Sequence, residues 1–245
     1  MNAIEINISE IKKRIVIVCK RMGRYSNEIK LLLATKTVST ENIKMAIACG
    51  ETLIGENKVQ ELKEKYDDLK HVKHTKHFIG HLQSNKIKDI LKCEVSCIQS
   101  IDRIDIAEKL HQRLLLENKT LDIFIQVNTS NEASKFGVSP EEVESLVRAV
   151  ASLSTLKIKG LMTIGLFSAE TDKVRACFQL LKKIQQQLIA LNIKNVALNE
   201  LSMGMSGDLE IAIEEGATII RVGTAVFGKR IYPDSYYWNE NQPIL

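Results

Sequence analysis

A lysine at the end of an apolar run is the first residue of this chain that suggests chemistry. The run LLLATKT, residues 31–37, is typical of a strand buried on both faces, and Lys36 lies near its carboxyl end. A buried ammonium group is costly, so a lysine in this place usually extends to water. Between apolar walls, however, a lysine can lose its proton and act as an amine nucleophile. The other polar residues must decide between these interpretations.

Two glycine-containing segments late in the chain have the composition of phosphate-binding loops. In SMGMSGD, residues 202–208, the glycines relieve the backbone, Ser202 and Ser206 carry hydroxyls, and a following helix offers N–H groups. The segment RVGT, Arg221 to Thr224, forms a second such turn. Either segment alone is equally well explained as a tight turn with a helix cap. Their pairing is what favours phosphate.

An amine nucleophile and a phosphate cradle in one protein indicate a phosphorylated aldehyde held as a Schiff base. Pyridoxal 5′-phosphate is the cofactor that needs both features. A sugar phosphate in an aldolase needs them too, and the residues alone leave both ligands open.

The elements that would position these residues alternate along the chain. Apolar side chains between Ile4 and Met22 recur at the three and four spacing of an amphipathic helix. Eight predicted strands follow, at residues 31–36, 52–57, 77–81, 94–100, 121–128, 157–165, 196–204 and 218–228. Helices are predicted at residues 39–50, 58–70, 85–91, 102–118, 140–153, 172–191 and 207–216, with Ser39 or Thr40 as the cap of the first.

Strict alternation predicts a parallel sheet with helical crossovers. Eight such units in 245 residues predict a closed (β/α)8 TIM barrel with an extra N-terminal helix, in a single domain of residues 1–245. An open doubly wound sheet is the alternative, but its glycine-rich dinucleotide turn is missing after the first strand. In a barrel, the carboxyl ends of the strands share one face, so Lys36 and both loops should meet there. This convergence favours the nucleophile interpretation of Lys36.

The composition narrows the class of protein. The net charge of +4 arises from 34 basic and 30 acidic residues, and the alternating charges of ELKEKYDDLK, residues 61–70, predict a solvated helix face. The basic stretch KHVKHTKH carries few aromatics, so we predict no nucleic-acid binding. Five scattered cysteines suit a reducing compartment. We see neither a signal peptide nor a run of ~20 apolar residues, and we predict a cytoplasmic protein without a membrane segment.

Seven motifs taken together resemble a known family. Their order and spacing resemble those of the pyridoxal-phosphate-binding homeostasis proteins, which are related to the barrel domain of alanine racemase. The motifs are LLLATKT, IGENKVQE, HFIGHLQSNK, KFGV, GLMTIG, LSMGMSGD and IRVGTAVFG. The resemblance covers about residues 31–228. It implies a fold-type III cofactor barrel in which Lys36 carries pyridoxal 5′-phosphate as an internal aldimine.

The resemblance also implies the remaining cofactor contacts. It places Asn57 beside the ring, Met162 at a wall and Arg221 at the pyridine nitrogen. Phosphate contacts are implied for Ser202, Gly223 and Thr224, with Ser206 as a helper. An arginine cannot give up its proton, so the ring nitrogen would stay unprotonated and the cofactor would be a weaker electron sink than with a carboxylate partner.

The implied role is carriage of the cofactor without established catalysis. A carrier of this kind keeps the free aldehyde low, affects amino-acid and keto-acid balance, and has apo-enzymes that use the cofactor as candidate partners. We expect a monomer or weak dimer. An amino-acid racemase is the alternative, but racemases take their second base, a tyrosine, from a further domain for which we expect no room here. Tyr232, Tyr236 and Tyr237 are better explained as a tail packed over the barrel end.

Two further groups of residues suggest chemistry. His71, His74, His77 and His81 resemble a metal site, but their spacing crosses from a loop into a predicted strand, so no helix face holds all four. We therefore predict no metal. Lys135, in KFGV after the fifth strand, is a hypothetical second amine for the cofactor.

Overall fold

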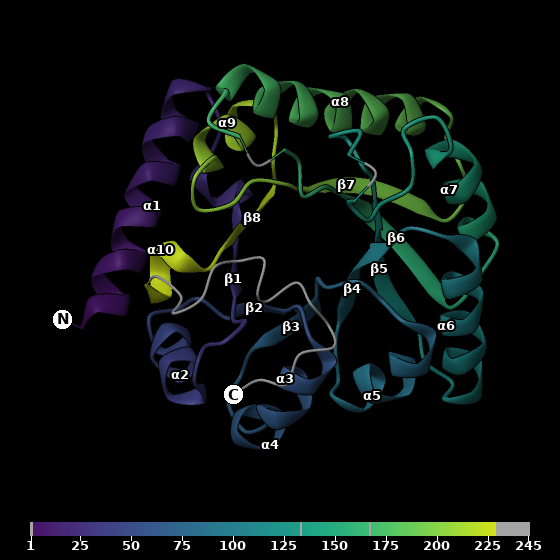
Figure 1. Cartoon of the computed structure of the whole chain (residues 1–245), viewed down its shortest axis with the longest axis horizontal. Coiled ribbons are helices and arrows are strands. Elements are labelled where there is room, and N and C mark those ends of the chain that lie inside the picture. Colours follow the sequence, from purple (N-terminus) through teal and green to yellow (C-terminus); the bar gives the residue numbers. More distant parts are fainter. Residues whose placement is uncertain (1, 133, 167, 229–245) are drawn as a thin grey trace.

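The computed structural model describes residues 2–132, 134–166 and 168–228, and within them eight parallel strands close into a barrel (Figure 1). Neighbouring strands pair in chain order, and β8 pairs with β1 to close the ring. The strands are β1 (Lys30–Ala34), β2 (Leu53–Glu56), β3 (Thr75–Phe78), β4 (Cys97–Ile101), β5 (Leu121–Gln126), β6 (Leu156–Met162), β7 (Val196–Ser202) and β8 (Ile219–Val222). The predicted TIM barrel is confirmed.

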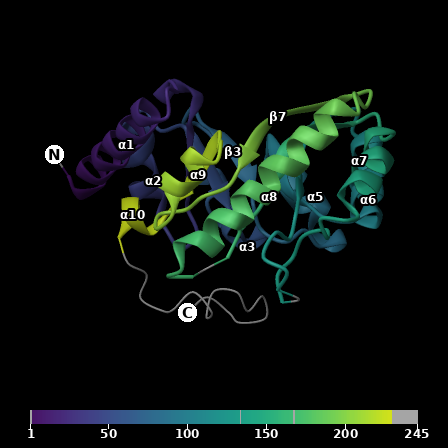
Figure 2. The same ribbon diagram turned by 90° about the horizontal axis from the view of Figure 1, so that it is seen from above.

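Helices surround the ring of strands (Figures 1 and 2). They are α1 (Ala3–Arg21), α2 (Thr40–Ala48), α3 (Val59–Glu64), α4 (Tyr66–Leu69), α5 (Ile87–Lys92), α6 (Ile104–Leu116), α7 (Val143–Ala151), α8 (Thr171–Ala190), α9 (Leu209–Glu214) and α10 (Thr224–Phe227), with the 3-10 turns η1 (Ser26–Glu28) and η2 (Ser84–Lys86). None of the helices in this part of the chain is long and apolar enough to cross a membrane.

The predicted N-terminal helix is α1, which is additional to the eight strand and helix units. Asn2 caps it by accepting a hydrogen bond from the backbone N–H of Glu5 at 2.9 Å. Its apolar stripe packs against α2, α9 and α10. The stripe ends earlier than predicted, because Met22 lies beyond the last helical turn and is 44% exposed.

Several predicted boundaries are wrong, among them the following three. The eighth strand ends at Val222, where the backbone of Gly223 leaves the extended conformation and its carbonyl accepts the N–H groups of Val226 and Phe227, which begins α10. The predicted helix 58–70 is divided into α3 and α4. The third strand ends at Phe78 instead of residue 81. In the first two cases a local hydrogen-bonded turn replaces a continuous element.

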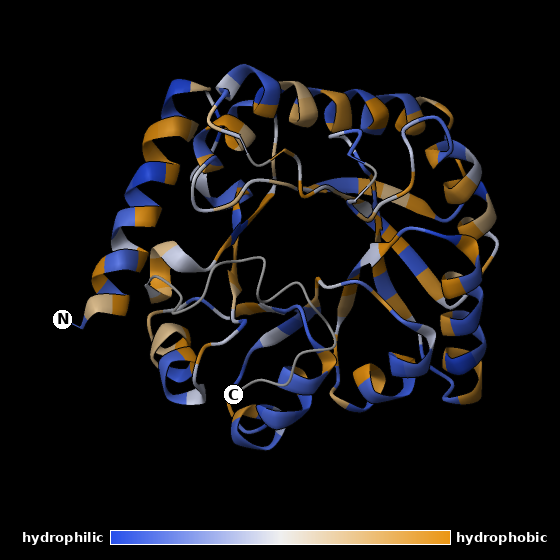
Figure 3. Ribbon diagram, viewed as in Figure 1, coloured by the Kyte–Doolittle hydropathy of each residue, from blue (hydrophilic) through white to orange (hydrophobic). Residues whose placement is uncertain are grey.

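The apolar core has two parts, which lie on the two faces of the sheet. A continuous layer of buried residues lies between the strands and the helices. Helices such as α1 and α8 contribute apolar side chains to it, and hydrophobic and hydrophilic residues alternate along these helices (Figure 3). A smaller cluster fills the barrel interior: Leu32, Ile79, Cys97, Phe124, Met162 and Ile219. This interior cluster is the floor beneath the carboxyl ends of the strands.

Candidate functional site

Lys36 lies in a turn directly after β1 and is 4% exposed. In β1, Leu32 and Ala34 face the apolar barrel interior, and Lys36 is the next residue in this alternating series. Thr37 follows it with a φ of 63°, a conformation that β-branched residues rarely adopt. The lysine is therefore held at the carboxyl end of β1, at the face of the barrel that the sequence predicts.

Two glutamates and a lysine hold the backbone of this turn. Lys65 Nζ donates to the carbonyl oxygen of Thr35 at 2.7 Å. The same ammonium bonds Glu56 at 2.7 Å and Glu61 at 2.8 Å. Glu61 accepts the backbone N–H of Thr37 at 2.6 Å, and Glu56 accepts the Thr35 hydroxyl at 2.5 Å. Side chains from β2 and from the segment of α3 and α4 thus fix both ends of the turn.

The charges of this cluster are buried. Burial raises the pKa of Glu56, and the nearby Lys65 ammonium only partly opposes this. Burial also lowers the pKa of Lys65, but Glu56 and Glu61 outweigh it, so its pKa is raised overall. The prediction of a solvated helix face for residues 61–70 is wrong at Glu61 and Lys65, because α3 turns these side chains toward the strand ends.

Arg221 heads a chain of hydrogen bonds across the barrel interior. Its Nη1 donates to the Ser202 hydroxyl at 2.9 Å, which donates to Gln99 Oε1 at 2.6 Å. Gln99 Nε2 then lies 2.7 Å from His77 Nδ1. Because an amide nitrogen can only donate, His77 accepts at Nδ1 and its neutral ring carries the proton on Nε2. Burial, assisted by Lys30, lowers the pKa of His77 to about 4.

The guanidinium of Arg221 is buried, and among the residues that the structure describes it contacts no counter-ion. Its second donor, Nη2, bonds the carbonyl oxygen of Thr163 at 2.7 Å. Within residues 2–132, 134–166 and 168–228, no carboxylate forms an ion pair with it. Burial lowers its pKa to about 10, and Asp208 opposes this from a distance. A buried cation of this kind suits an acceptor atom of a ligand, such as a ring nitrogen.

The loops after β7 and β8 meet as the sequence predicts. Ser206 Oγ accepts the backbone N–H of Ala225 at 3.3 Å and lies 3.4 Å from the Thr224 hydroxyl. Gly204 has a φ of 89°, and a Cβ there would lie 2.4 Å from that of Ala212. The glycine is thus required in this loop. Two hydroxyls and a backbone N–H gathered by long, weak bonds are a donor set suited to phosphate.

An arginine of the N-terminal helix supports this loop from outside. Arg14 forms a paired interaction with Glu210 at 2.6 and 2.8 Å, and its Nη2 also lies 3.4 Å from the carbonyl oxygen of Ser206. Within the loop, Asp208 accepts the backbone N–H of Met205 at 2.5 Å. The extra helix therefore contributes to the position of the loop after β7.

Met162, predicted at a wall of the site, and Asn57, predicted beside the cofactor ring, lie at different depths of the barrel. Met162 is 1% exposed and belongs to the interior cluster, so it lies beneath the mouth of the barrel. Asn57 is partly buried just after β2. A Cβ at Gly80 would lie 1.8 Å from the carbonyl oxygen of Asn57, so the loop after β3 packs directly against the segment that carries this asparagine.

The KFGV loop is tied to the rim of the barrel. Lys135 Nζ donates to the carbonyl oxygen of Gly165 at 2.8 Å and forms an ion pair with Glu132. The Phe136 ring stacks on His81 with ring centres 3.7 Å apart. His81, whose motif suggests no task from sequence, thus joins the loops after β3 and β5.

Two pairs of the predicted residues are in contact. Ser202 accepts a hydrogen bond from Arg221, and the hydroxyl of Thr224, beside Gly223, donates to that of Ser206. Of the four histidines, His77 lies in the interior chain and His81 at the rim. In the described ranges no group of three His, Cys, Asp or Glu residues could hold a metal. Tyr232, Tyr236 and Tyr237 lie outside the described residues.

Sequence reasoning missed three residues of this region, Glu61, Lys65 and Gln99, and it considered His77 only as a metal ligand. Glu61 and Lys65 stand four residues apart, a helical ion-pair spacing, but nothing in the spacing tells a buried pair from a solvated one. Gln99 lies in an otherwise apolar strand, a signal that could have been used.

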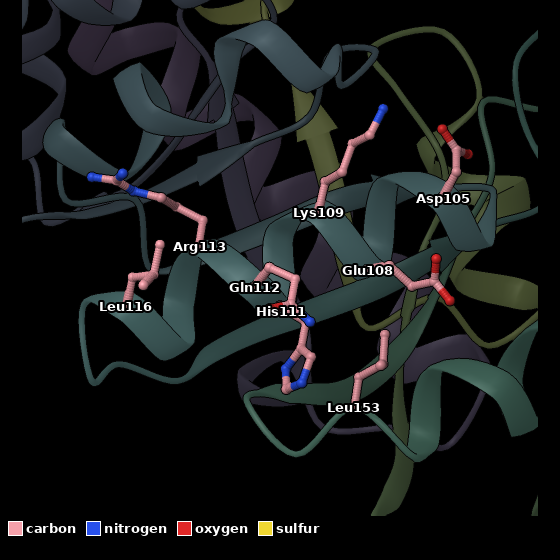
Figure 4. Close-up of a pocket in the computed structure, with 8 residues that line it drawn as sticks. All are labelled: Asp105, Glu108, Lys109, His111, Gln112, Arg113, Leu116 and Leu153. Atoms are coloured by element: carbon pink, nitrogen blue, oxygen red, sulfur yellow. The ribbon is translucent and has the colours of Figure 1, made fainter.

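A hollow of about 710 Å³ lies elsewhere, on the outer surface around α6 (Figure 4). Its lining residues are Asp105, Glu108, Lys109, His111, Gln112, Arg113, Leu116 and Leu153. All but Leu153 belong to α6, and their side chains spread in different directions from the helix. It shares no residue with the groups at the strand ends.

Residues 4–231 match the family described as alanine racemase, N-terminal domain. Relatives called pyridoxal phosphate homeostasis protein are similar over nearly full length. That of Aquifex aeolicus is 43% identical over 95% of this chain and 100% of its own length. Those of Pseudomonas aeruginosa and Escherichia coli K12 are 38% and 37% identical over 95% of this chain and 98% and 99% of their own.

Solved structures share the fold. A protein of unknown function from Bifidobacterium adolescentis has a TM-score of 0.86 and 34% identity, over 92% of this chain and 94% of its own. PipY of Synechococcus elongatus with pyridoxal phosphate bound has a TM-score of 0.75 and 30% identity, over 89% of this chain and 100% of its own. An alanine racemase of Clostridium difficile has a TM-score of 0.74, over 96% of this chain and 58% of its own. Its identity is only 11%, so it shows likeness of fold alone.

Proposed function

We infer that this chain, which belongs to the family of pyridoxal phosphate homeostasis proteins, binds pyridoxal 5′-phosphate as a Schiff base on Lys36. The observation that carries the proposal is the burial of Lys36 at the carboxyl end of β1. A barrel shares one face among all its strand ends, and the donors of the loops after β7 and β8 lie at the same face. A buried amine and a phosphate cradle then serve one ligand.

Lys36 supplies the covalent bond. Its amine nitrogen would replace the aldehyde oxygen of the cofactor, and that oxygen would leave as one molecule of water. The bond is reversible by addition of the same water, which a carrier requires for release.

The loops after β7 and β8 would hold the phosphate. Ser206, Thr224 and the backbone beside Gly223 offer hydroxyl and N–H donors in one place. Ser202 was predicted for the same task, and its hydroxyl would have to turn away from Gln99 in order to donate to phosphate. We therefore assign the main phosphate contacts to Ser206, Gly223 and Thr224.

Arg221 would face the pyridine nitrogen, between Met162 below and Asn57 at the side of the ring. The support for this role is that its buried guanidinium contacts only neutral oxygens within the described ranges. When bound, the cofactor supplies an electron-accepting ring, and an arginine partner leaves this ring a weak acceptor. Stabilisation of a substrate carbanion would be correspondingly modest.

We propose carriage of the cofactor and no catalysis. Racemisation requires a base on each face of the substrate carbon. Of the two tyrosines in the described part, Tyr25 is 76% exposed and Tyr66 packs with Lys76, so neither supplies a second base at the strand ends. Deuterium exchange at the α-carbon of a panel of amino acids tests this, and measurable turnover would support a racemase instead.

Absorbance and chemical trapping test the binding proposal. The full chain mixed with pyridoxal 5′-phosphate should turn yellow, and borohydride should fix the label on the peptide that contains Lys36. Lys36→Ala should lose both signals, while Lys63→Ala, an exposed lysine of α3, should keep them. A wild-type protein that stays colourless with added cofactor and takes no label would falsify the proposal. Label at Lys135 in wild type would support the second amine.

Delivery is the remaining part of the proposed role. We place the protein in the cytoplasm, as a monomer or weak dimer that passes the cofactor to apo-enzymes. A time course of activation of one apo-enzyme, with the loaded protein compared with free cofactor at equal concentration, measures delivery. Activation no faster than the rate at which the cofactor dissociates would show release into solution without direct transfer.

A further inference from the structure

The two peptide groups that flank Lys36 are each bonded by a charged side chain. The carbonyl of Thr35, on the amino side of the lysine, accepts from Lys65 Nζ at 2.7 Å. The N–H of Thr37, on the carboxyl side, donates to Glu61 Oε2 at 2.6 Å. Glu61 and Lys65 also bond each other at 2.8 Å, so one buried ion pair spans the turn.

This pair holds a backbone that would otherwise relax. Thr37 has a φ of 63°, which is unfavourable for a β-branched residue and persists only where the surroundings enforce it. The backbone N–H of Val38 closes the turn on the carbonyl of Thr35 at 3.0 Å, and the short charge-assisted bond from the N–H of Thr37 to Glu61 adds to this. Without it, the turn could move toward a commoner conformation and carry the lysine with it.

Ordinary structural support does not explain the cluster. Glu56 Oε2 and Glu61 Oε1 are buried and find no hydrogen-bond partner among the described residues. Such burial is costly, and apolar side chains could join β2 to α3 more cheaply. Apolar side chains, however, could bond neither the carbonyl of Thr35 on one side of the turn nor the N–H of Thr37 on the other.

We propose that Glu61 and Lys65 are positioning residues that hold the Lys36 amine where it meets the aldehyde of the cofactor. The inference rests on the proposed function, because it concerns the same lysine. Both side chains bond the backbone of the lysine turn, so they should affect covalent bond formation while leaving the contacts of the phosphate and the ring unchanged.

The first test needs no cofactor. The exchange of the Thr37 amide hydrogen with solvent, followed by NMR, reports on its bond to Glu61. Glu61→Leu should exchange at least about tenfold faster at this amide, since about 1.4 kcal/mol corresponds to a factor of ten. Glu61→Gln keeps an acceptor and should recover most of the protection. Glu64→Leu, an exposed position of the same helix, should leave it unchanged.

The second test separates positioning from general damage. Pyridoxine 5′-phosphate carries an alcohol in place of the aldehyde, so it binds through ring and phosphate but forms no covalent bond. Glu61→Leu and Lys65→Met should slow covalent attachment of pyridoxal 5′-phosphate about tenfold, and should bind pyridoxine 5′-phosphate as wild type does. Lys63→Met is the matched control for Lys65. If Glu61→Leu does not fold, Glu61→Asp, one methylene shorter, takes its place.

The outcomes distinguish the two proposals. Unchanged attachment rates in both variants, with label on Lys36 in wild type, would refute positioning and leave the proposed function intact. Equal weakening of the binding of pyridoxal 5′-phosphate and pyridoxine 5′-phosphate would also refute positioning, because that result indicates a structural role. A wild type that never labels Lys36 would overturn both. A selective loss of attachment, restored by Glu61→Gln, would establish positioning.

Discussion

Acid should destabilise the protein through His77. The folded pKa of this residue is about 4, against about 6.5 in an unfolded chain, so the unfolded state binds the extra proton first. The stability that neutral His77 contributes is fully present above pH 6.5 and is lost as the pH falls toward 4. Two and a half units at 1.36 kcal/mol each give an upper limit of about 3 kcal/mol, and partial solvent access reduces this to about 2.

Urea unfolding between pH 7.5 and 4.5 measures this effect. His77→Gln keeps an acceptor for Gln99 but has no charge to gain. Subtracting its free energy of unfolding from that of wild type cancels other titrating groups, such as Glu56. The difference should be level above pH 6.5 and should fall by about 2 kcal/mol by pH 4.5. A difference that stays level to pH 4.5 would refute the assignment of a buried neutral imidazole to His77.

Three other substitutions have effects that the structure predicts. Gln99→Leu should cost about 2–4 kcal/mol in urea unfolding because it strands two buried polar groups, whereas Gln112→Leu on the surface of α6 should change the stability by less than about 0.5 kcal/mol. Gly80→Ala should cost about 3 kcal/mol or more, since its Cβ would collide with the carbonyl of Asn57, and an unchanged melting temperature would contradict that contact. Ser206→Ala should weaken the binding of pyridoxine 5′-phosphate about five- to tenfold in calorimetric titration, and an affinity equal to that of wild type would exclude this hydroxyl from the phosphate site.

The fold was predictable because barrel strands and amphipathic helices leave periodic traces in sequence. Runs such as residues 121–126 and the stripe of α1 show their burial directly, since each local pattern faces a core. The end of the eighth strand was not predictable in this way. Val226 and Phe227 continue an apolar run, and only the turn at Gly223 converts that run into a helix.

The candidate site divides along the same line. Lys36 at a strand end and the serine and glycine loops after β7 and β8 could be found from residue types, because the barrel brings all strand ends to one face. The partners that hold them could not. In the sequence, Glu61 and Lys65 look like a solvated ion pair. Gln99 lies 103 residues before Ser202, whose hydroxyl donates a hydrogen bond to it. Sequence therefore determined which polar residue types stand at the ends of the strands. Tertiary structure alone decided which charges are buried there, since burial depends on what packs against a helix face from elsewhere in the chain.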